Sequence, residues 1–290
     1  MNGNAITIRG LTKKFNEFSL GPFEMNVPTG GIYGFIGPNG SGKTTTIDLM
    51  LGMGHEDSGT IEMLGLHHRR DEVSIKREVG YVSPELNYQA WGTVGKAIQF
   101  SRGFYPSWDH AHCERLLKSF NLGSNDKIVT LSFGSKIKLA LVIALSHRPK
   151  LLILDEPTVG LDALSKQEVF SELLAAVETG ERTVLISSHG LSDIERFADS
   201  IGMIKKGKMV IEGTTGAVVE RFRVVDFLKP PGMNWNPPNG IRLMTKDGDR
   251  YRLLIDMTQG GLEWIKSQGI AEVLLSPVTL EEIFLVLAKD

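Results

Sequence analysis

Short apolar runs alternate with amphipathic, helix-like segments over most of this chain. Runs bounded by turn-forming residues predict β-strands, and apolar residues three or four positions apart predict α-helices. The strands expected on this basis are a run beginning at residue 31 and residues 5–9, 18–23, 59–63, 79–83, 151–154, 183–187, 201–204 and 209–211. Helices are expected between them, at 43–51 and 163–177 among other places. This alternation predicts an α/β layer fold with a mixed, largely parallel sheet.

The segment from residue 93 to residue 147 has a helical pattern, interrupted at Tyr105-Pro106 and at residues 123–126. We therefore expect a helical subdomain of about residues 86–148, inserted between strands of the sheet. Within it, residues 139–145 are all apolar, which is typical of a helix buried on every side.

The pattern changes again near residue 216. Residues 242–245 and 250–255 read as strands on either side of Lys246-Asp247-Gly248-Asp249, a good hairpin turn, and a helix, a strand and a closing helix at 280–288 follow. Two proline pairs bound a loop around Trp235. We predict two domains, residues 1–215 and a small α+β domain of residues 216–290.

The net charge and the cysteine content limit the classes of partner and compartment that we expect. The 290 residues carry a formal net charge of -2, which provides no bulk attraction to nucleic acid or anionic lipid, so we expect no nucleic-acid partner. The single cysteine, Cys113, excludes an internal disulfide and fits a reducing compartment. We expect an inert helical thiol there.

No stretch reads as a membrane span or a signal peptide. The longest uninterrupted apolar run is residues 139–145, whereas a spanning helix needs about 20 apolar residues. The first four residues are polar and lack the basic and apolar regions of a secretory signal. We therefore expect a cytoplasmic protein.

A glycine-rich loop between a predicted strand and a predicted helix is the clearest chemical motif. It matches the pattern G-x-x-x-x-G-K-[ST], in which glycines let backbone N–H groups surround phosphate oxygens. An ordinary glycine-rich turn is the alternative. The residues expected to bind phosphate are Gly37, Pro38, Asn39, Gly40, Ser41, Gly42, Lys43, Thr44 and Thr45. Lys43 would reach the β- and γ-phosphates, Thr44 would help to hold Mg²⁺, and the helix dipole would favour an anion.

Phe15 lies upstream of this loop, at the edge of a predicted strand. An aromatic ring at such a place either stacks on a nucleotide base or packs in the core, and both remain open.

Two adjacent acids, Asp155 and Glu156, follow the apolar run of residues 151–154. Such a run suits a strand buried on both faces, and ligands bind at the carboxyl ends of strands in open α/β sheets. Burying both carboxylates without partners would cost several kcal/mol, so a purely structural role needs cations opposite them. Asp155 is suited to hold Mg²⁺ through water, and Glu156 to act as the general base toward an attacking water.

These motifs, together with Leu131-Ser132-Phe133-Gly134-Ser135, Gly160-Leu161-Asp162 and His189, resemble an ABC-type ATPase in order and spacing over about residues 5–215. The resemblance implies a P-loop NTPase that binds ATP and Mg²⁺ and sandwiches two ATP molecules between two subunits. Ser132 and Gly134 would then serve the site of the other subunit, Asp162 would link the two sites, and His189 would contact the γ-phosphate. Taken alone, Asp162 would also fit a helix N-cap and His189 a surface residue.

Lys136 and Lys138 lie in the first turns of the helix that follows Ser135, where positive charge opposes the helix dipole. An anion that faces this end would relieve the conflict. Two solvated lysines are the alternative, since the effect at a surface is only about 0.3 to 1 kcal/mol.

The chain departs from the family pattern at several places. Glu85 stands where a glutamine that senses Mg²⁺ and the membrane partner is usual, so its carboxylate falls near the metal. Phe133 and Ser135 replace Gly and Gln, and the base-stacking aromatic would be Phe15 instead of Tyr. Slow turnover and a heterodimer with one weaker site therefore remain open.

Other histidines are set aside as ligands. His67 and His68 are adjacent, would diverge on a helix, and look like a solvated charged stretch with the two arginines that follow. His110 and His112 show no compact metal-ligand spacing.

The resemblance also implies a division of labour, in which this chain is the motor and a separate membrane permease is the channel. Residues 89–93 would form the groove for a coupling helix of that permease, unless Trp91 is ordinary core. Residues 104–109 and 276–284 resemble ATPases of bacterial ABC-2 exporters, which handle drugs, peptides, lipids or sodium. We expect a homodimer or heterodimer, peripheral on the inner face of the cell membrane. Soluble ABC proteins of ribosomes or DNA, and P-loop kinases, are disfavoured by the single glycine loop, the lack of heptads and the motif set.

Overall fold

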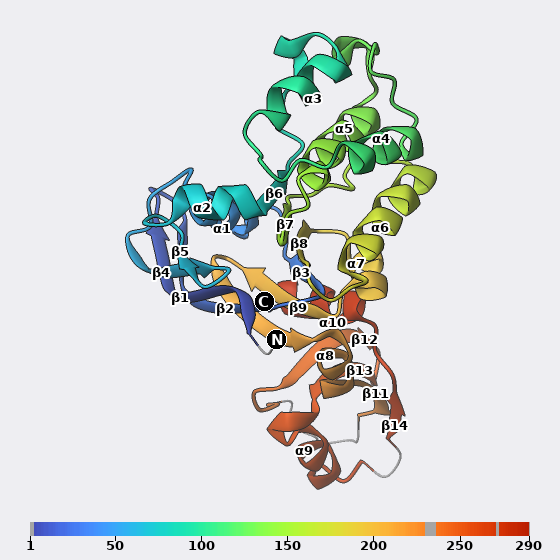
Figure 1. Ribbon diagram of the computed structural model, residues 1–290. Coiled ribbons are helices and arrows are strands. Elements are labelled where there is room, and N and C mark those ends of the chain that lie inside the picture. Colours follow the sequence, from blue (N-terminus) through green and yellow to red (C-terminus); the bar gives the residue numbers. More distant parts are fainter. Residues whose placement is uncertain (1–2, 230–235, 271–272, 290) are drawn as a thin grey trace.

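The computed structural model describes residues 3–229, 236–270 and 273–289, so part of the expected loop around Trp235 lies outside the described residues. Figure 1 shows two sheets at the centre, a helical lobe at one end and the C-terminal unit at the other.

The central sheet has six strands in the order β10-β9-β3-β8-β7-β6. The strands are β3 (Ile32–Ile36), β6 (Val79–Val82), β7 (Leu151–Leu154), β8 (Thr183–Ser188), β9 (Ser200–Lys205) and β10 (Lys208–Thr214). All neighbours pair in parallel except β9 and β10, so the expected α/β fold with a mixed, largely parallel sheet is confirmed. Strands β3, β7 and β8 are buried along their whole length, which explains their non-alternating apolar sequences.

A four-stranded antiparallel sheet in the order β2-β1-β4-β5 packs beside the central sheet. It contains β1 (Asn4–Lys14), β2 (Ser19–Pro28), β4 (Ser58–Met63) and β5 (Leu66–His67). Its inner residues share a core with helix α1 (Lys43–Met50) and with one face of the central sheet, to which Ile153 of β7 contributes. Alternate residues of β7, such as Leu152, enter a second core on the opposite face. Helix α2 (Glu72–Glu78) was not expected from the sequence.

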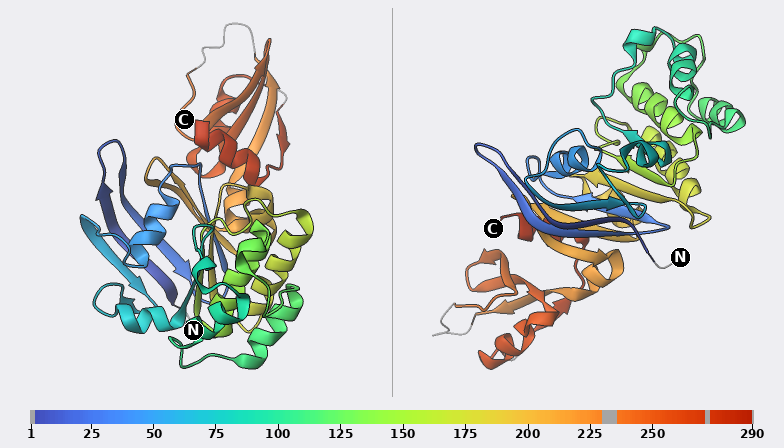
Figure 2. Two further views of the ribbon diagram at one scale, coloured as in Figure 1. Left: turned by 90° about the horizontal axis from the view of Figure 1, so that it is seen from above. Right: turned by 60° about the vertical axis from the view of Figure 1, so that its left-hand side comes forward.

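The helical lobe confirms the predicted pattern of residues 93–147. It comprises η1 (Gln89–Trp91), α3 (Val94–Arg102), α4 (His110–Ser119), η2 (Ile128–Thr130) and α5 (Phe133–Ser146). The expected breaks fall between α3 and α4 and between α4 and η2. The second half of α5 is buried on all sides, and Cys113 is buried in α4. Helices α6 (Ala163–Val177) and α7 (Leu191–Phe197) pack with α5 on the face of the central sheet opposite α1 (Figure 2).

The C-terminal unit has a sheet in the order β12-β13-β11-β14. Its elements are α8 (Thr215–Arg221), β11 (Phe222–Leu228), β12 (Ile241–Asp247), β13 (Arg250–Asp256), η3 (Met257–Gln259), α9 (Gly261–Ser267), β14 (Leu274–Ser276) and α10 (Leu280–Lys289). The expected hairpin is present as β12 and β13. One face of the sheet forms a small core of its own with α9.

The closing helix α10 returns to the first domain. Leu280, Ile283 and Phe284 belong to the large core that includes α5 and the central sheet. The backbone N–H of Leu280 donates to Glu195 Oε1 at 3.1 Å, and Lys205 Nζ donates to the carbonyl of Leu287 at 2.8 Å. The division at residue 215 stays a prediction, and any such boundary has to accommodate this shared core.

The interpretation of the His67-His68 stretch as a solvated helical segment was wrong. His67 ends strand β5, and the two rings stack with centroids 5.2 Å apart. His68 is only 1% exposed, and its ring nitrogens lie 3.2 Å from the Ile61 carbonyl and 3.3 Å from Glu56 Oε2. The pairing of β4 with β5 turns this ring inward. The sequence did not show this, because the two arginines that follow suggested an exposed stretch.

Candidate active site

The glycine-rich loop connects β3 to α1 at the carboxyl edge of the central sheet. A Cβ at Gly37 would lie 2.3 Å from the Ile204 carbonyl oxygen and 2.6 Å from Ser41 Oγ, so only glycine fits there. Gly42 has a φ of 110°, a conformation open to glycine but strained for other residues. These two glycines explain why the loop can keep its backbone close to the sheet and its N–H groups available to a phosphate.

Lys43 folds back over this loop. Its Nζ donates to the carbonyls of Gly37 at 2.8 Å and Pro38 at 3.3 Å, and it lies 3.2 Å from Glu156 Oε1. The side chain is buried, and Glu156 Oε1 accepts no hydrogen bond within the described residues. The ammonium therefore lies inside the loop, where it would meet the phosphates of a nucleotide.

Asp155 follows β7, is buried, and has no basic partner among the residues that the structure describes. It accepts from Thr44 Oγ1 at 2.8 Å through Oδ2 and from the Ser187 hydroxyl through Oδ1. Burial raises the pKa of Asp48 on α1, and the charges of Asp155 and Glu85 raise it further. These carboxylates thus create a negative field beside the Thr44 hydroxyl and the start of α1. Such a field, next to a Thr hydroxyl, suits a Mg²⁺ ion whose other ligands are phosphate and water oxygens.

The structure places Glu85 close enough to raise the pKa values of Asp48 and Tyr81, and its place near a bound Mg²⁺ stays a prediction. No three His, Cys, Asp or Glu side chains in residues 3–229, 236–270 and 273–289 converge as a ready-made metal-ligand set. A metal at this edge would therefore depend on the nucleotide for part of its ligands, which is the usual arrangement for Mg²⁺.

Glu156 lies between a lysine and a histidine. Its Oε2 is 2.8 Å from His189 Nδ1, and its Oε1 faces Lys43. The backbone of Glu156 has a φ of 46°, an uncommon conformation for a non-glycine residue, and its N–H donates to Ser187 Oγ at 2.9 Å. The end of the strand thus turns so that the carboxylate faces the glycine loop, where it could accept a proton from water.

A cavity of about 380 Å³ lies at this edge. Its lining residues are Phe18, Asn39, Gly40, Gly42, Lys43, Thr44, Thr45 and Glu156. Sequence reasoning missed Phe18, because only the pairing of β1 with β2 brings it to the loop. Phe15 does not line the cavity; it is half exposed, with its ring centroid 6.1 Å from that of Phe18. Stacking by Phe15 stays a prediction.

Ser132, Gly134 and Asp162 are not among the residues that line this cavity. Ser132 caps α5 by accepting from the N–H of Ser135 at 3.1 Å, and Asp162 caps α6 by accepting from the N–H of Ser165 at 2.8 Å. A Cβ at Gly134 would lie 3.1 Å from Leu161 Cδ2, so the two helix starts touch. The structure brings these residues together as a second group, apart from the glycine loop of their own chain.

Lys138 does not need an external anion to offset the helix dipole. Its Nζ lies 2.6 Å from Glu168 Oε2 of α6, and the side chain is largely buried. The sequence suggested that an external anion faces the start of α5. At Lys138 the carboxylate of Glu168 already takes that place.

A phosphate-binding loop between a parallel strand and a helix, with two acids at the end of a neighbouring strand, defines a P-loop nucleoside triphosphatase. The family model for the ABC transporter matches residues 20–159. The chain belongs to the family of ABC transporter ATP-binding proteins, which confirms the resemblance seen in the sequence.

Similar proteins support this assignment. The lantibiotic transport ATP-binding protein SrtF of Streptococcus pyogenes is 35% identical over 71% of this chain and 90% of its own length. The probable multidrug ABC transporter ATP-binding protein YbhF of Escherichia coli (strain K12) is 34% identical over 72% of this chain, which spans only 37% of YbhF. A solved structure of the ATP-binding subunit of an ABC transporter superposes with a TM-score of 0.68 at 25% identity, over 74% of this chain and 92% of that one.

Proposed function

We propose that this chain is the ATP-binding and ATP-hydrolysing subunit of an ABC exporter. The proposal rests on the position of Glu156. Its carboxylate lies between Lys43 of the glycine loop and His189, which directly follows β8. A carboxylate held at the γ-phosphate end of such a loop is placed to polarise an attacking water.

The residues of the glycine loop and of the two neighbouring strand ends have separate roles in this proposal. The loop of residues 37–42 and the start of α1 bind the phosphates with backbone N–H groups, and Lys43 neutralises the β- and γ-phosphates. Thr44 and Asp155 hold Mg²⁺, which supplies charge neutralisation when it is bound. Glu156 then accepts the proton of the attacking water, and His189 contacts the γ-phosphate.

Two subunits would complete two sites. Ser132 and Gly134 lie apart from the loop of their own chain, so we infer that they close the ATP site of a second copy or of a related subunit. Asp162 lies at the neighbouring helix start, and Leu161 before it touches Gly134. The proposal covers both a homodimer and a heterodimer with a second ABC ATPase.

A separate membrane permease is the proposed partner. None of the helices within the described residues is both long and apolar enough to cross a membrane. A row of aromatic rings follows the loop of Glu85, with neighbouring centroids 4.9 and 5.2 Å apart: Trp91, which is half-buried against the core, and the exposed Phe100 and Phe104. This row suits a helix of the permease, which would hold the chain on the inner face of the membrane. Export stays the proposed direction because residues 104–109 and 276–284 resemble ATPases of ABC-2 exporters, and the names of SrtF and YbhF describe transport of a lantibiotic and of multiple drugs. Residues 216–290 would form an accessory domain.

The test combines turnover with localisation. The purified chain should hydrolyse ATP in a manner that requires Mg²⁺, and the tagged chain should copurify from membranes with an integral subunit. Cosedimentation with ribosomes or DNA, without any integral subunit, would place the chain among the soluble ABC proteins instead. ATP binding without any hydrolysis, alone or with that subunit, would contradict the assignment of Glu156.

A further inference from the structure

A second charged cavity lies on the helical side of the molecule, apart from the glycine loop. It has a volume of about 260 Å³ and lies between α4, the end of α5, α6 and the start of β8. Its lining residues are His112, Arg115, Leu145, Arg148, Pro149, Glu172, Ala175, Ala176 and Arg182. None of them lines the nucleotide cavity, so the nucleotide site does not account for this cluster.

The only acid in the lining is already satisfied. Glu172 Oε1 accepts from Arg115 Nη1 at 3.0 Å and from Ser119 Oγ at 2.9 Å, and its Oε2 accepts from Arg115 Nη2 at 2.8 Å. The charges of Arg115 and Glu172 therefore cancel each other, and the carboxylate has no reason to bind a further cation. Arg148 is ion-paired with Asp109 at 2.9 Å, so among the described residues the excess positive charge of the lining lies on Arg182.

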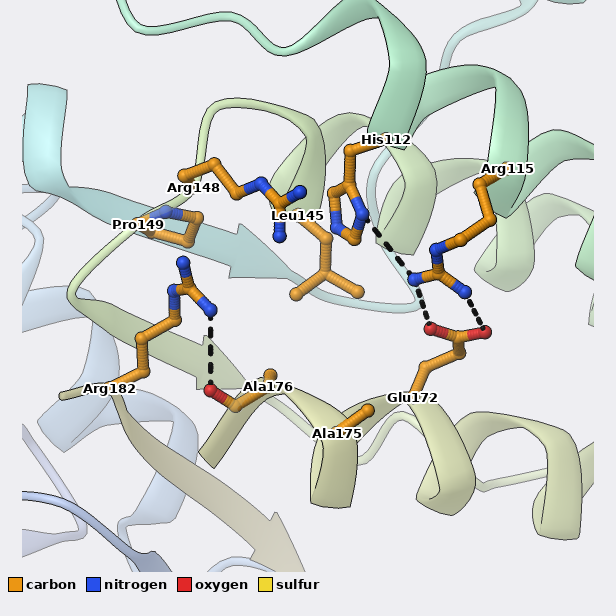
Figure 3. Close-up of a pocket in the computed structure, with 9 residues that line it drawn as sticks. All are labelled: His112, Arg115, Leu145, Arg148, Pro149, Glu172, Ala175, Ala176 and Arg182. Carbon is orange, nitrogen blue, oxygen red and sulfur yellow. Dashed lines mark hydrogen bonds and ion pairs between the residues drawn. The ribbon is translucent and has the colours of Figure 1, made fainter. Parts of the chain in front are cut away.

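Both of these arginines keep donors available. Arg148 donates Nε and Nη2 to Asp109 Oδ2, at 3.0 and 2.9 Å, which leaves Nη1 without a partner in the described part of the chain. Arg182 donates only Nη1, to the Ala176 carbonyl at a long 3.5 Å, and it has no carboxylate partner among the residues described. Figure 3 shows both side chains on the same side of the view, with Pro149 beside them, and both line the cavity.

His112 adds a neutral donor. Its Nδ1 lies 3.4 Å from Arg115 Nη2, and because a guanidinium can only donate, Nδ1 must be the acceptor. The neutral ring then carries its proton on Nε2, on the side of Arg148 in Figure 3. Burial and then the charges of Arg148 and Arg115 together lower the pKa of His112 to about 4, against the opposite effects of Asp109 and Glu172. An added anion would reverse this effect.

We propose that this cavity binds a small phosphate-bearing anion between Arg148, Arg182 and His112. A planar carboxylate is satisfied by one guanidinium fork, whereas a tetrahedral phosphate presents oxygens to donors that approach from several elements. The volume suits a phosphate group or a small phosphate ester and is below the usual range of sites for drug-sized ligands. Leu145, Ala175 and Ala176 form the apolar part of the wall.

The proposed anion site lies where the helical lobe meets the central sheet. It joins α4 and α5 of the helical lobe to α6 and to the start of β8, the strand that His189 follows. An anion held between Arg148 and Arg182 would link the helical lobe to the central sheet. A phosphate compound could therefore act on this link without entering the nucleotide cavity.

The experiment uses the full chain with Lys43→Ala, which weakens phosphate binding at the glycine loop, and inorganic phosphate as the probe. The pKa of His112 is followed by NMR of its ring, and chloride at the same ionic strength serves as the reference. Saturable binding should raise the pKa of His112, and Arg182→Gln in the same background should weaken the binding about tenfold. Arg102→Gln, on α3 outside the cavity, is the matched control and should bind as before.

Arg182→Lys tests the site without loss of charge. It should bind phosphate with intermediate affinity, because an ammonium retains the attraction but not the fork of donors. The proposal is overturned if the pKa of His112 does not respond to phosphate beyond the chloride reference. It is also overturned if Arg182→Gln, folded with an unchanged melting temperature, binds as tightly as the control. Neither result would affect the proposed ATPase function.

Discussion

His189 Nδ1 lies 2.8 Å from Glu156 Oε2, although 33 residues separate the two in the chain. The other carboxylate oxygen of Glu156 faces Lys43 Nζ at 3.2 Å. The carboxylate is thus held between two basic groups that both lie at the end of the proposed phosphate site. When a γ-phosphate attracts Lys43, the carboxylate loses one partner and becomes available to water.

His189→Ala should lower the rate of ATP hydrolysis about tenfold to a hundredfold while the affinity for ATP changes little. The imidazole contacts Glu156 and, in the proposed mechanism, would contact the γ-phosphate, so its loss should affect the transition state more than the bound nucleotide. Steady-state kinetics with nucleotide titration measure both quantities. A variant that loses affinity but keeps its maximal rate would show that His189 serves binding alone.

Lys43→Ala should weaken ATP binding about a hundredfold, because the ammonium lies inside the phosphate loop and its charge-assisted contacts are strong. Isothermal titration calorimetry gives the affinity directly. Lys118→Ala, on α4, is a matched control that removes an exposed lysine far from the loop and should bind ATP normally. Tight binding by Lys43→Ala would contradict the phosphate cradle.

The two phenylalanines near the loop can be separated by paired variants. Phe15→Leu and Phe18→Leu should each weaken ATP binding by about 1 kcal/mol if the base stacks on Phe15 and Phe18 supports that ring. Phe104→Leu, an exposed ring on the helical lobe, should bind ATP normally. If only Phe18→Leu weakens binding, the base contacts the ring that lines the cavity, and the sequence-based expectation for Phe15 fails.

Acid should weaken the fold through Glu56. A side-chain hydrogen bond from Arg69 lowers the pKa of Glu56 from 4.5 to about 2. Because the folded value is the lower one, the stabilisation is complete above pH 4.5 and is lost as the pH falls from 4.5 toward 2. Glu56→Gln should cost about 1 kcal/mol at neutral pH, after allowance for solvent screening, and less as the pH falls. Urea unfolding from pH 6 to pH 3 measures this difference.

Glu17→Gln, at an exposed glutamate in the turn between β1 and β2, provides the control for that series. Its stability should follow that of the unmodified chain at every pH. A constant difference between Glu56→Gln and the unmodified chain over the whole range would show that the ion pair with Arg69 does not titrate in the fold.

Local chemistry was readable from the sequence. The glycine loop and the acids after residues 151–154 each carry their own signal, because a turn or a strand end needs those residue types in that order. The hairpin around Gly248 and the boundaries of α6 were likewise predicted from short-range pattern.

Contacts between distant segments were not readable. The burial of His68 depends on strand pairing, the partner of Lys138 lies on another helix, and Phe18 reaches the nucleotide cavity only through the β1–β2 hairpin. The charged cavity is of the same kind, since Arg148 and Arg182 are brought together by packing of α5, α6 and β8. None of these pairs has a fixed spacing that a sequence pattern could show.

The most direct test of the central claim is the molar mass of the Glu156→Gln variant in the presence of ATP and Mg²⁺, measured by light scattering after gel filtration. The amide keeps the shape of the side chain but cannot accept the proton, so hydrolysis should fall at least about a hundredfold and the ATP-bound dimer should accumulate. Glu156→Gln combined with Ser132→Ala should dimerise less. A monomer at saturating ATP, or an unchanged rate of hydrolysis, would contradict the central claim.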